Sequence, residues 1–392
     1  MTHVNKPPLY TLVFALLCLS QALFSASFNM IIPELPEYLR SMGGEKYIGL
    51  IIALFTITAG LSRPFSGKLT DTIGRIPVQI IGTLVCVFAS LMYPFVSSVF
   101  GFLLLRLFHG FSTGFKPTAS SAYLADIVPV ARRGEAMGIL GVSMNLGSSI
   151  APPFGSYLAA EYSLEHMFYF SSALALLSVL LLFGMKETLA DKKKFQVSVL
   201  KLKRTDIIDK SALLPASIAL LTYLSIGALL TIGPDQSSFL GVSNKGFFFT
   251  SFTLCSVLSR LVAGKVSDKY GRVQVLRISI LLLSASLAFF ALVDSPTMFL
   301  IAAGLLGFSL GTASPPIFAW VIDRCKDENR GKALATVYIA LEISIGSGAV
   351  FSGWIYDNDP KNFGLTFILL AMITLIGVLI LHNKKDIDVI SD

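Results

Sequence analysis

The sequence predicts an all-α integral membrane protein whose twelve transmembrane helices form two pseudo-symmetric six-helix bundles. The first observation behind this prediction is composition: 54% of the 392 residues are hydrophobic and only 14% are charged. A typical soluble domain is about 25% charged, so this chain lacks the polar surface that would keep it in water. A series of long apolar runs and an internal repeat are the second and third observations.

The apolar runs are each close to about 20 residues, the length of helix that spans a bilayer. They are continuous rather than alternating, which favours helices over the strands of a closed barrel, the other structure that satisfies its backbone in lipid. Twelve spans and short loops leave no room for a soluble catalytic domain. The predicted spans are 9–32, 48–66, 77–97, 99–124, 135–159, 165–185, 212–233, 246–263, 274–293, 296–321, 332–355 and 364–382.

The internal repeat relates the two halves of the chain at a constant offset of 197 residues. The segment GKLTDTIGR at 67–75 returns as GKVSDKYGR at 264–272, and HGFSTG at 109–114 returns as LGFSLG at 306–311. The offset holds without a gap, and Arg63 maps onto Arg260. We therefore expect two parallel six-helix halves, at 1–186 and 212–392, joined by a Lys-rich cytoplasmic linker at 187–211.

The distribution of positive charge predicts the orientation. With the N-terminus in the cytoplasm, the outer loops carry only Arg40, Lys46, Lys245 and Lys361, and nearly all other loop Lys and Arg residues are cytoplasmic. This bias favours cytoplasmic positions for both termini, in a multi-pass protein of the plasma (inner) membrane. The net charge of +7 is then topological, and no nucleic-acid partner is expected.

Chemistry that needs a cofactor is not indicated. The four cysteines and the four histidines are scattered, without the spacing of a metal site, a disulfide framework or an enzyme active site. There is no phosphate-binding loop of the G-x-x-x-x-G-K-[ST] type, so ATP is not expected to drive this polypeptide directly. We predict no metal, no cofactor and no enzymatic activity.

The repeat also carries a family resemblance. Two parallel six-helix halves, each with G-x-L-x-D-x-x-G-R-like text after its second helix, resemble the major facilitator superfamily along the whole chain. The first copy, at 67–75, fits that loop motif closely. The resemblance implies a monomer that binds a small molecule near the midplane, between halves that rock to expose the site to each side in turn. Within the superfamily, the chain resembles the twelve-helix drug:proton antiporter branch.

The repeated loop motif is predicted to form a cytoplasmic gate. Its glycines allow a tight turn, and Asp71 and Asp268 are expected to meet basic residues and a helix N-terminus of the opposite half as a reversible latch. Positive-inside anchoring without switching is the alternative interpretation. The gate residues predicted are Gly67, Asp71, Gly74, Arg75, Gly264, Asp268, Gly271, Arg272, Asp126 and Arg133.

A second motif lies in the fifth predicted span. The segment GSSIAPPFGS at 147–156 resembles the antiporter motif G-x-x-x-G-P-x-x-G-G, with Ala151 and Ser156 in place of two glycines. The resemblance implies export in exchange for protons through a bent helix. Ordinary packing of small residues explains the same text. The motif residues are Gly147, Ala151, Pro152 and Gly155.

The fourth span carries an ionisable stripe. Arg106, His109, Thr113 and Lys116 lie within about 80° of one another on a helix, and we expect this face to line the central cavity. Arg106 stands in RLFHG, which resembles a family motif whose arginine is implicated in proton coupling, and His109 is a second proton-coupling candidate. Alternatively, His109 is a neutral residue of a helix interface and Lys116 extends to the cytoplasmic surface.

Glu342 is the carboxylate that the sequence places nearest the midplane, with Tyr338 one turn earlier. A charge at that depth normally marks function, so Glu342 is our first candidate for proton coupling; a static partner for Arg106 or Lys116 is the alternative. Further cavity candidates are Gln21, Ser25, Asn29 and Asn145, which polar helix contacts would explain equally well. The ionisable residues predicted to lie within the membrane carry a net positive charge, which favours an anionic or zwitterionic substrate.

These observations together predict a proton-coupled secondary transporter that exports a small organic molecule by antiport, through rocker-switch alternating access. A symporter that imports a small polar or anionic metabolite or a sugar is the alternative. A membrane receptor would need a signalling domain, for which the twelve spans leave little chain. The expected partners are the substrate, protons and the lipid bilayer.

Overall fold

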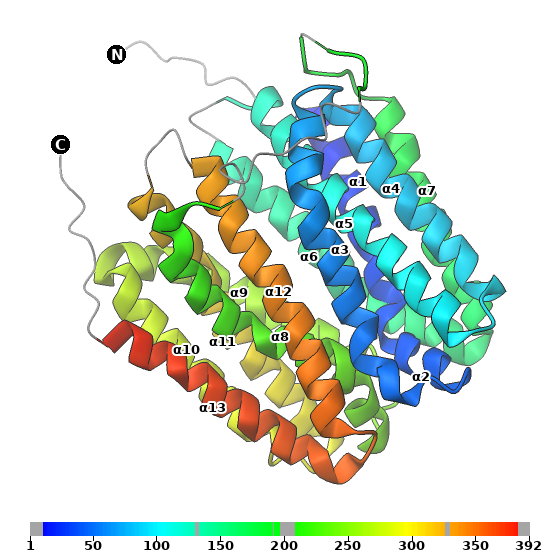
Figure 1. Cartoon of the computed structure of the whole chain (residues 1–392), viewed down its shortest axis with the longest axis vertical. Helices are drawn as coiled ribbons and strands as arrows, with labels where there is room; N and C mark the ends of the chain where they lie inside the picture. The colour runs from blue at the N-terminus through cyan, green and yellow to red at the C-terminus, as the bar shows by residue number, and fades with distance from the viewer. Residues whose placement is uncertain (1–10, 130–132, 191, 197–207, 326–329, 383–392) are drawn as a thin grey trace.

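A computed structural model describes residues 11–129, 133–190, 192–196, 208–325 and 330–382 (Figure 1). This part of the chain contains no strand and twelve long helices. Short helical segments accompany them: α2 (Leu35–Arg40) and single turns at 32–34, 45–47, 93–95, 210–212 and 360–362. The long helices are α1 (Leu12–Met30), α3 (Ile48–Thr70), α4 (Arg75–Met92), α5 (Val99–Ile127), α6 (Arg133–Glu161), α7 (Leu164–Phe183), α8 (Leu213–Phe239), α9 (Phe247–Tyr270), α10 (Arg272–Phe290), α11 (Pro296–Arg324), α12 (Arg330–Tyr356) and α13 (Phe363–His382).

The long helices have the dimensions of membrane spans, which confirms the predicted fold class. Within the described residues, ten helical segments are both long enough and apolar enough to cross a bilayer. The other two, α5 and α6, are each 29 residues long, which is also long enough to cross a bilayer. Helices of this length close all their interior backbone hydrogen bonds, as lipid requires.

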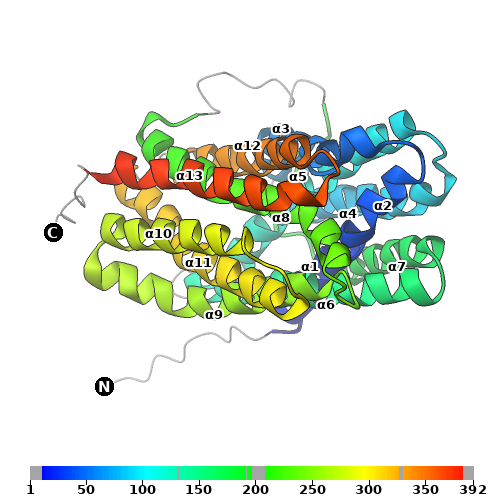
Figure 2. The same cartoon turned by 90° about the horizontal axis from the view of Figure 1, so that it is seen from below.

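The helices form two bundles. The first, which we call the N-half, consists of α1 and α3–α7; its main contacts are α1 with α6 and α7, α3 with α5, and α4 with α5 and α7. The second, the C-half, consists of α8–α13 and repeats these contacts with α8, α9, α10, α11, α12 and α13. Figure 2 shows the bundles side by side, with the last residues of α13 on one side and α2 on the other. We call these sides the terminal end and the opposite end.

The halves meet along two helix crossings that the repeat makes equivalent: α3 with α12, and α9 with α6. Glycine permits the close approach at the first crossing. A Cβ at Gly49 would lie 2.7 Å from the Ala349 carbonyl oxygen, and one at Gly346 would lie 2.7 Å from Thr56 Oγ1. At the second crossing, Gly246 lies directly against the backbone of Pro152 and Pro153.

The turns between α3 and α4 and between α9 and α10 depend on Gly74 and Gly271. Their φ angles are +123° and +90°, a region that residues with a side chain rarely adopt. Gly67 and Gly264 lie inside α3 and α9, and a Cβ at either position would meet no neighbour within 4 Å. The tight turn expected of Gly67 is thus made by Gly74.

Candidate functional site

The centre of the molecule holds an ion pair between the two halves. Arg63 of α3 donates from Nη2 to Glu342 Oε1 of α12 over 2.6 Å, and the side chains are 19% and 10% exposed. An isolated charge at this depth is costly, so each side chain depends on the other. The sequence singled out Glu342 for proton coupling and named Arg106 or Lys116 as its partner only in the alternative interpretation. The signal for Arg63 was its place in the repeat, inside a predicted span.

Tyr338 and Arg260 extend this centre. The Arg63 guanidinium lies 5.1 Å from the Tyr338 ring centroid, and Tyr338 is 39% exposed although it lies well inside α12. Arg63 and Arg260 both lie close enough to Tyr338 to interact with it electrostatically. Arg260 of α9 is the repeat equivalent of Arg63, but among the described residues it forms no ion pair and its buried Nε has no partner. Asn145 of α6 is the equivalent of Glu342.

Arg106 and His109 were expected to line the central cavity, but this prediction is wrong. Both side chains are fully buried inside the N-half and do not face the C-half. Arg106 Nε donates to the Ile51 carbonyl over 2.8 Å, and its guanidinium lies 4.6 Å from the Phe55 ring centroid. His109 Nδ1 and Nε2 lie 3.3 Å from Tyr93 Oη and from Cys86 Sγ. Both residues thus tie α5 to its neighbours α3 and α4 and to the turn after α4.

Lys116 lies in the same interior, about two turns beyond His109 and about three beyond Arg106 along α5. Its Nζ donates to Ser20 Oγ over 2.7 Å and approaches Gln79 Oε1 at 3.4 Å, and no carboxylate is among its contacts in the described chain. Ser120 links Gln79 to Gln21. Lys116 therefore neither reaches the surface nor faces the other half, and the cationic field that it was expected to supply comes from Arg63 and Arg260.

The polar residues of α1 also act within the N-half. Ser25 Oγ donates to the Met144 carbonyl over 2.7 Å, and Asn29 Nδ2 donates to Ser148 Oγ over 3.0 Å, so both residues bind α1 to α6. Thr113 donates to its own helix at the Gly110 carbonyl. Of the predicted cavity residues, Tyr338 is the one that the structure brings to the Arg63–Glu342 pair.

The antiporter-like segment of α6 has two faces. Gly147 and Gly155 lie against the α1 backbone at Ala22 and Met30. Pro153 has no N–H, which leaves the Ser149 carbonyl without its helical donor. Thr250 Oγ1 of α9 donates to that carbonyl over 2.6 Å, and Asn244 Nδ2 donates to the Pro153 carbonyl over 2.8 Å. The proline segment is therefore a contact between the halves as well as a packing site.

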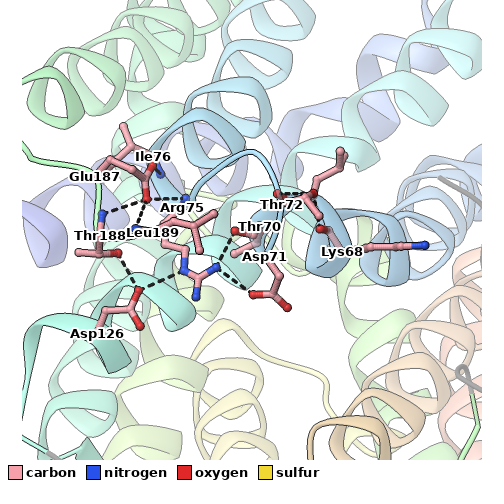
Figure 3. A network of polar contacts seen from close by, with 11 residues as sticks. Lys68, Thr70, Asp71, Thr72, Arg75, Ile76, Asp126, Glu187, Thr188 and Leu189 are labelled. Carbon is pink, nitrogen blue, oxygen red and sulfur yellow. Dashed lines mark hydrogen bonds and ion pairs between the residues drawn. The ribbon is translucent and has the colours of Figure 1, made fainter. Parts of the chain in front are cut away.

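The charged residues of each gate motif form ion pairs within their own half. Arg75 donates to Asp71 at 2.9 Å and to Asp126 at 3.1 Å, and Arg272 contacts Asp268 and Asp323 in the same way (Figure 3 shows the first copy). Asp71 and Asp268 side chains are 73% and 67% exposed, and no contact with the opposite half is present among the described residues. The side chain of Arg133, the expected partner, lies outside the described residues.

Glu187, which the sequence did not single out, completes the first gate. Its carboxylate accepts hydrogen bonds from the backbone N–H groups of Arg75 and Ile76 at 3.0 Å, and from Thr188 and Leu189 at 2.9 Å (Figure 3). It thereby satisfies the free N-terminus of α4. Burial opposes ionisation of Glu187, but these four donors outweigh it and lower its pKa. A Cβ at Gly74 would lie 2.5 Å from Glu187 Oε2.

The opposite end is closed by ion pairs between the halves. Arg40 of α2 binds Asp235 of α8 and donates to Asn358 Oδ1 over 2.9 Å. Lys245 binds Glu37 and lies 3.2 Å from Glu34. Burial opposes the charge on Lys245, but the two carboxylates outweigh it and raise its pKa. Glu34 and Glu37 thus join the N-half to the C-half.

Two repeated helical bundles, with an ion pair between them inside the membrane span and separate polar clusters at each end, define a transport protein of the two-bundle class. The model of the Major Facilitator Superfamily matches residues 17–241 and 215–386. The chain belongs to this superfamily, which confirms the resemblance seen in the sequence.

Comparisons with individual proteins agree with this assignment. The chain is 28% identical over 311 residues to the multi-drug resistance efflux pump PmrA homolog of Lactococcus lactis, covering 74% of this chain and 75% of that protein. It is 26% identical to multidrug resistance protein MdtG of Serratia proteamaculans, covering 90% and 89%.

Two solved structures share the fold. The D-xylose-proton symporter has a TM-score of 0.79 at 16% identity, covering 97% of this chain and 98% of that one. The human organic anion transporter MFSD10 has a TM-score of 0.72 at 18% identity, covering 94% and 98%.

Proposed function

We propose that the protein is a monomeric, proton-coupled transporter that exports a small organic molecule in exchange for protons. The observation that carries this proposal is the Arg63–Glu342 ion pair, because it joins the two halves inside the membrane span through a side chain that can take up a proton. Efflux pumps among the relatives and the antiporter-like segment of α6 support the direction.

The coupling step begins with protonation of Glu342. Ionised Glu342 holds Arg63 and so attaches α12 to α3; a proton removes the charge and with it the attraction. Glu342 accepts from Arg63 of α3, and the Arg63 guanidinium lies over the Tyr338 ring of α12. Tyr223 of α8 and Arg260 of α9 interact electrostatically with the same tyrosine. The carboxylate is thus the acidic member of a cationic group, and its protonation changes the net charge between the halves.

The alternating step uses the two ends of the molecule. Ion pairs join the halves at the opposite end, whereas Asp71 and Asp268 at the terminal end stay exposed within their own halves. We take this arrangement as the state open toward the terminal end, and we place that end in the cytoplasm. In the alternate state, Asp71 and Asp268 are then free to meet the other half, and the pairs of Arg40 and Lys245 separate.

Exchange requires that the proton and the substrate compete. A substrate that presents a hydrogen-bond donor or a positive group to ionised Glu342 displaces Arg63 and excludes the proton, so its binding weakens at low pH. A substrate with only negative charge behaves in the opposite way, because a proton on Glu342 leaves Arg63 and Arg260 without a counter-charge. Import of such an anion together with a proton is the second candidate function. Arg260 favours it, because it forms no ion pair with any residue in the described ranges.

The test is transport by purified protein in liposomes with an imposed pH gradient. Glu342→Gln is expected to abolish gradient-driven substrate movement, because the amide cannot exchange a proton. Asp294→Asn, the same change at an exposed loop position, is the matched control and should transport as the wild type does. Undiminished dependence on the gradient in Glu342→Gln would disprove the coupling role. Movement of the substrate in the same direction as the protons, rather than in the opposite direction, would indicate symport instead of antiport.

A further inference from the structure

Arg260 is a charged side chain deep in the membrane that the helix contacts do not explain. It lies about 20 Å from the start of α9 and about 15 Å from its end, at 1.5 Å per residue. Charged residues at such a depth normally face a partner or a wetted cavity. Arg260 is part-buried, and its helix packs on α11 and α6, yet the side chain lies within electrostatic reach of Tyr338 on α12.

The contrast with other buried arginines is direct. Arg63 has Glu342, and Arg106 has a backbone carbonyl and an aromatic ring. Arg260 has neither an ion pair nor a hydrogen bond among the described residues. The Nε atoms of Arg260 and Arg63 are both buried without an acceptor, but only Arg63 has a carboxylate beside its guanidinium. The position equivalent to Glu342 holds Asn145, so the C-half arginine has no carboxylate from the fold itself. An arginine cannot relieve this by losing its proton.

We propose that Arg260 binds the carboxylate of the transported molecule, between α9 and α12. A guanidinium matches a carboxylate through two parallel hydrogen bonds, which gives both energy and orientation. Arg63, Arg260 and Glu342 together carry one net positive charge, which a single carboxylate neutralises. The part-exposed Tyr338 ring, which packs at a tilt against Phe318 with 5.1 Å between centroids, offers an apolar surface to the body of the ligand.

The ligand class is therefore a small organic molecule with one carboxylate and an apolar, preferably aromatic, body. Under antiport the same molecule carries a donor or positive group for Glu342; under symport it is a simple anion. This inference rests on the proposed function in one respect: it takes the space between the halves as the substrate path. It does not require that transport be coupled to protons.

The experiment measures equilibrium binding to purified protein in nanodiscs of neutral phosphatidylcholine, by calorimetry and thermal shift. The probes are benzoate, 2-naphthoate and 4-aminomethylbenzoate, each compared with its alcohol analogue. Wild type should bind at least one carboxylate about tenfold or more tightly than its alcohol. Arg260→Gln should remove this preference, and Arg260→Lys should keep part of it. If no carboxylate is preferred, or if Arg260→Gln keeps the preference, the proposal is wrong.

The matched control is Lys265→Gln, which removes a positive charge from the same helix about 140° around its axis. Lys265 is exposed, and its variant should bind the probes as wild type does. An equal loss in this variant would mean that general charge, rather than Arg260, attracts the anion, and would overturn the assignment.

A measurement on wild type alone covers the possibility that Arg260→Gln does not fold. Phenylglyoxal modifies arginine, and mass spectrometry reports the modified fraction of Arg260. The preferred carboxylate should protect Arg260, whereas its alcohol should not; equal modification would contradict the proposal. An anionic lipid headgroup is the other source of the same chemistry. If added phosphatidylglycerol abolishes both binding and protection by the carboxylate, Arg260 is a lipid site and the substrate assignment fails.

These binding measurements need no pH gradient, so the two proposals fail separately. Loss of carboxylate preference with gradient-driven transport intact removes only the role of Arg260. Carboxylate binding with no response of transport to the gradient removes only the proton coupling.

Discussion

The two crossings between the halves have the same place in the repeat but different chemistry. At α3 and α12, small residues bring the backbones together near the opposite end, and the contact continues inward to the Arg63–Glu342 ion pair. At α9 and α6, the contact near the opposite end is made by the carbonyls of Ser149 and Pro153. Further inward lies Arg260, for which no described residue provides a carboxylate. The repeat thus contains two equivalent arginines, Arg63 and Arg260. Only Arg63 has a carboxylate at the matching position of the other half, because Asn145 stands where Glu342 would be.

This difference separates two tasks. A crossing with an ion pair can respond to a proton, because one member of the pair titrates. A crossing with an arginine and an amide keeps its charge at every physiological pH and supplies no carboxylate that would compete with a negatively charged ligand. We therefore assign proton coupling to the α3–α12 crossing and ligand binding to the α9 side, and each assignment can be tested by changing one crossing toward the other.

The largest effect is expected from breaking the ion pair. Glu342→Gln leaves Arg63 charged and unpaired, so the loss of stability should approach the roughly 3–5 kcal/mol typical of a broken buried pair. Arg63→Gln should cost less, because the remaining carboxylate can take up a proton. Thermal unfolding of both single variants and of the double variant measures this order. Equal losses that simply add in the double variant would show that the two residues do not interact.

Adding a carboxylate at the α9–α6 crossing should give Arg260 an ion-pair partner like that of Arg63. Asn145→Glu places an acid at the position equivalent to Glu342, where it can pair with Arg260. We expect carboxylate probes to bind about tenfold or more weakly, with the protein still folded. Asn145→Gln, which adds the same length without charge, is the control and should bind nearly as wild type does. Unchanged binding in Asn145→Glu would show that residue 145 does not face Arg260.

A smaller effect is expected at the proline segment. Thr250→Val removes the hydroxyl that donates to the Ser149 carbonyl and leaves that carbonyl unsatisfied, at a cost of about 1–3 kcal/mol. The thermal midpoint should fall, and Thr250→Ser, which keeps the hydroxyl, should restore most of it. Because α3 has Ala53 at the equivalent position, this hydrogen bond belongs to one crossing alone. No difference between the Val and Ser variants would exclude its contribution.

The smallest effect concerns pH and Glu187. Its folded-state pKa is lowered by the backbone donors that outweigh burial. The stability it contributes is therefore full above its ordinary pKa of about 4.3 and is lost as the pH falls through the lower, folded-state value. Unfolding of wild type and Glu187→Gln, followed from pH 6 downward, should converge in acid. A constant difference at all pH values would mean that the amide differs for another reason.

Much of this architecture follows from the sequence. The long apolar runs and the offset of 197 residues predict the helices, the two halves and the paired gates, because lipid allows few ways to satisfy a backbone. The positive φ of Gly74 and Gly271 agrees with a motif that needs glycine at those turns. Glu342 stands out for the same reason: a lone carboxylate within an apolar run is too costly to be incidental.

The stripe on α5 shows where such reasoning stops. Helical spacing places Arg106, His109 and Lys116 near one face, but it does not say which helices cover that face. The structure covers it with α1, α3 and α4 of the same half. The sequence does not distinguish a buried cation that binds carbonyls, hydroxyls and rings from one that faces a cavity. These acceptors are distributed along the chain and form no recognisable motif.

The sequence alone therefore determined that this chain is a duplicated bundle of membrane helices with charges inside it, since burial of backbone and charge in lipid is decided by local composition. Only the tertiary structure decided that Arg63 pairs with Glu342 across 279 residues, that Arg260 has no partner within the part of the chain that the structure describes, and that Glu187 caps α4. Pairing depends on which helix faces meet, and that is set by the packing of all the helices together.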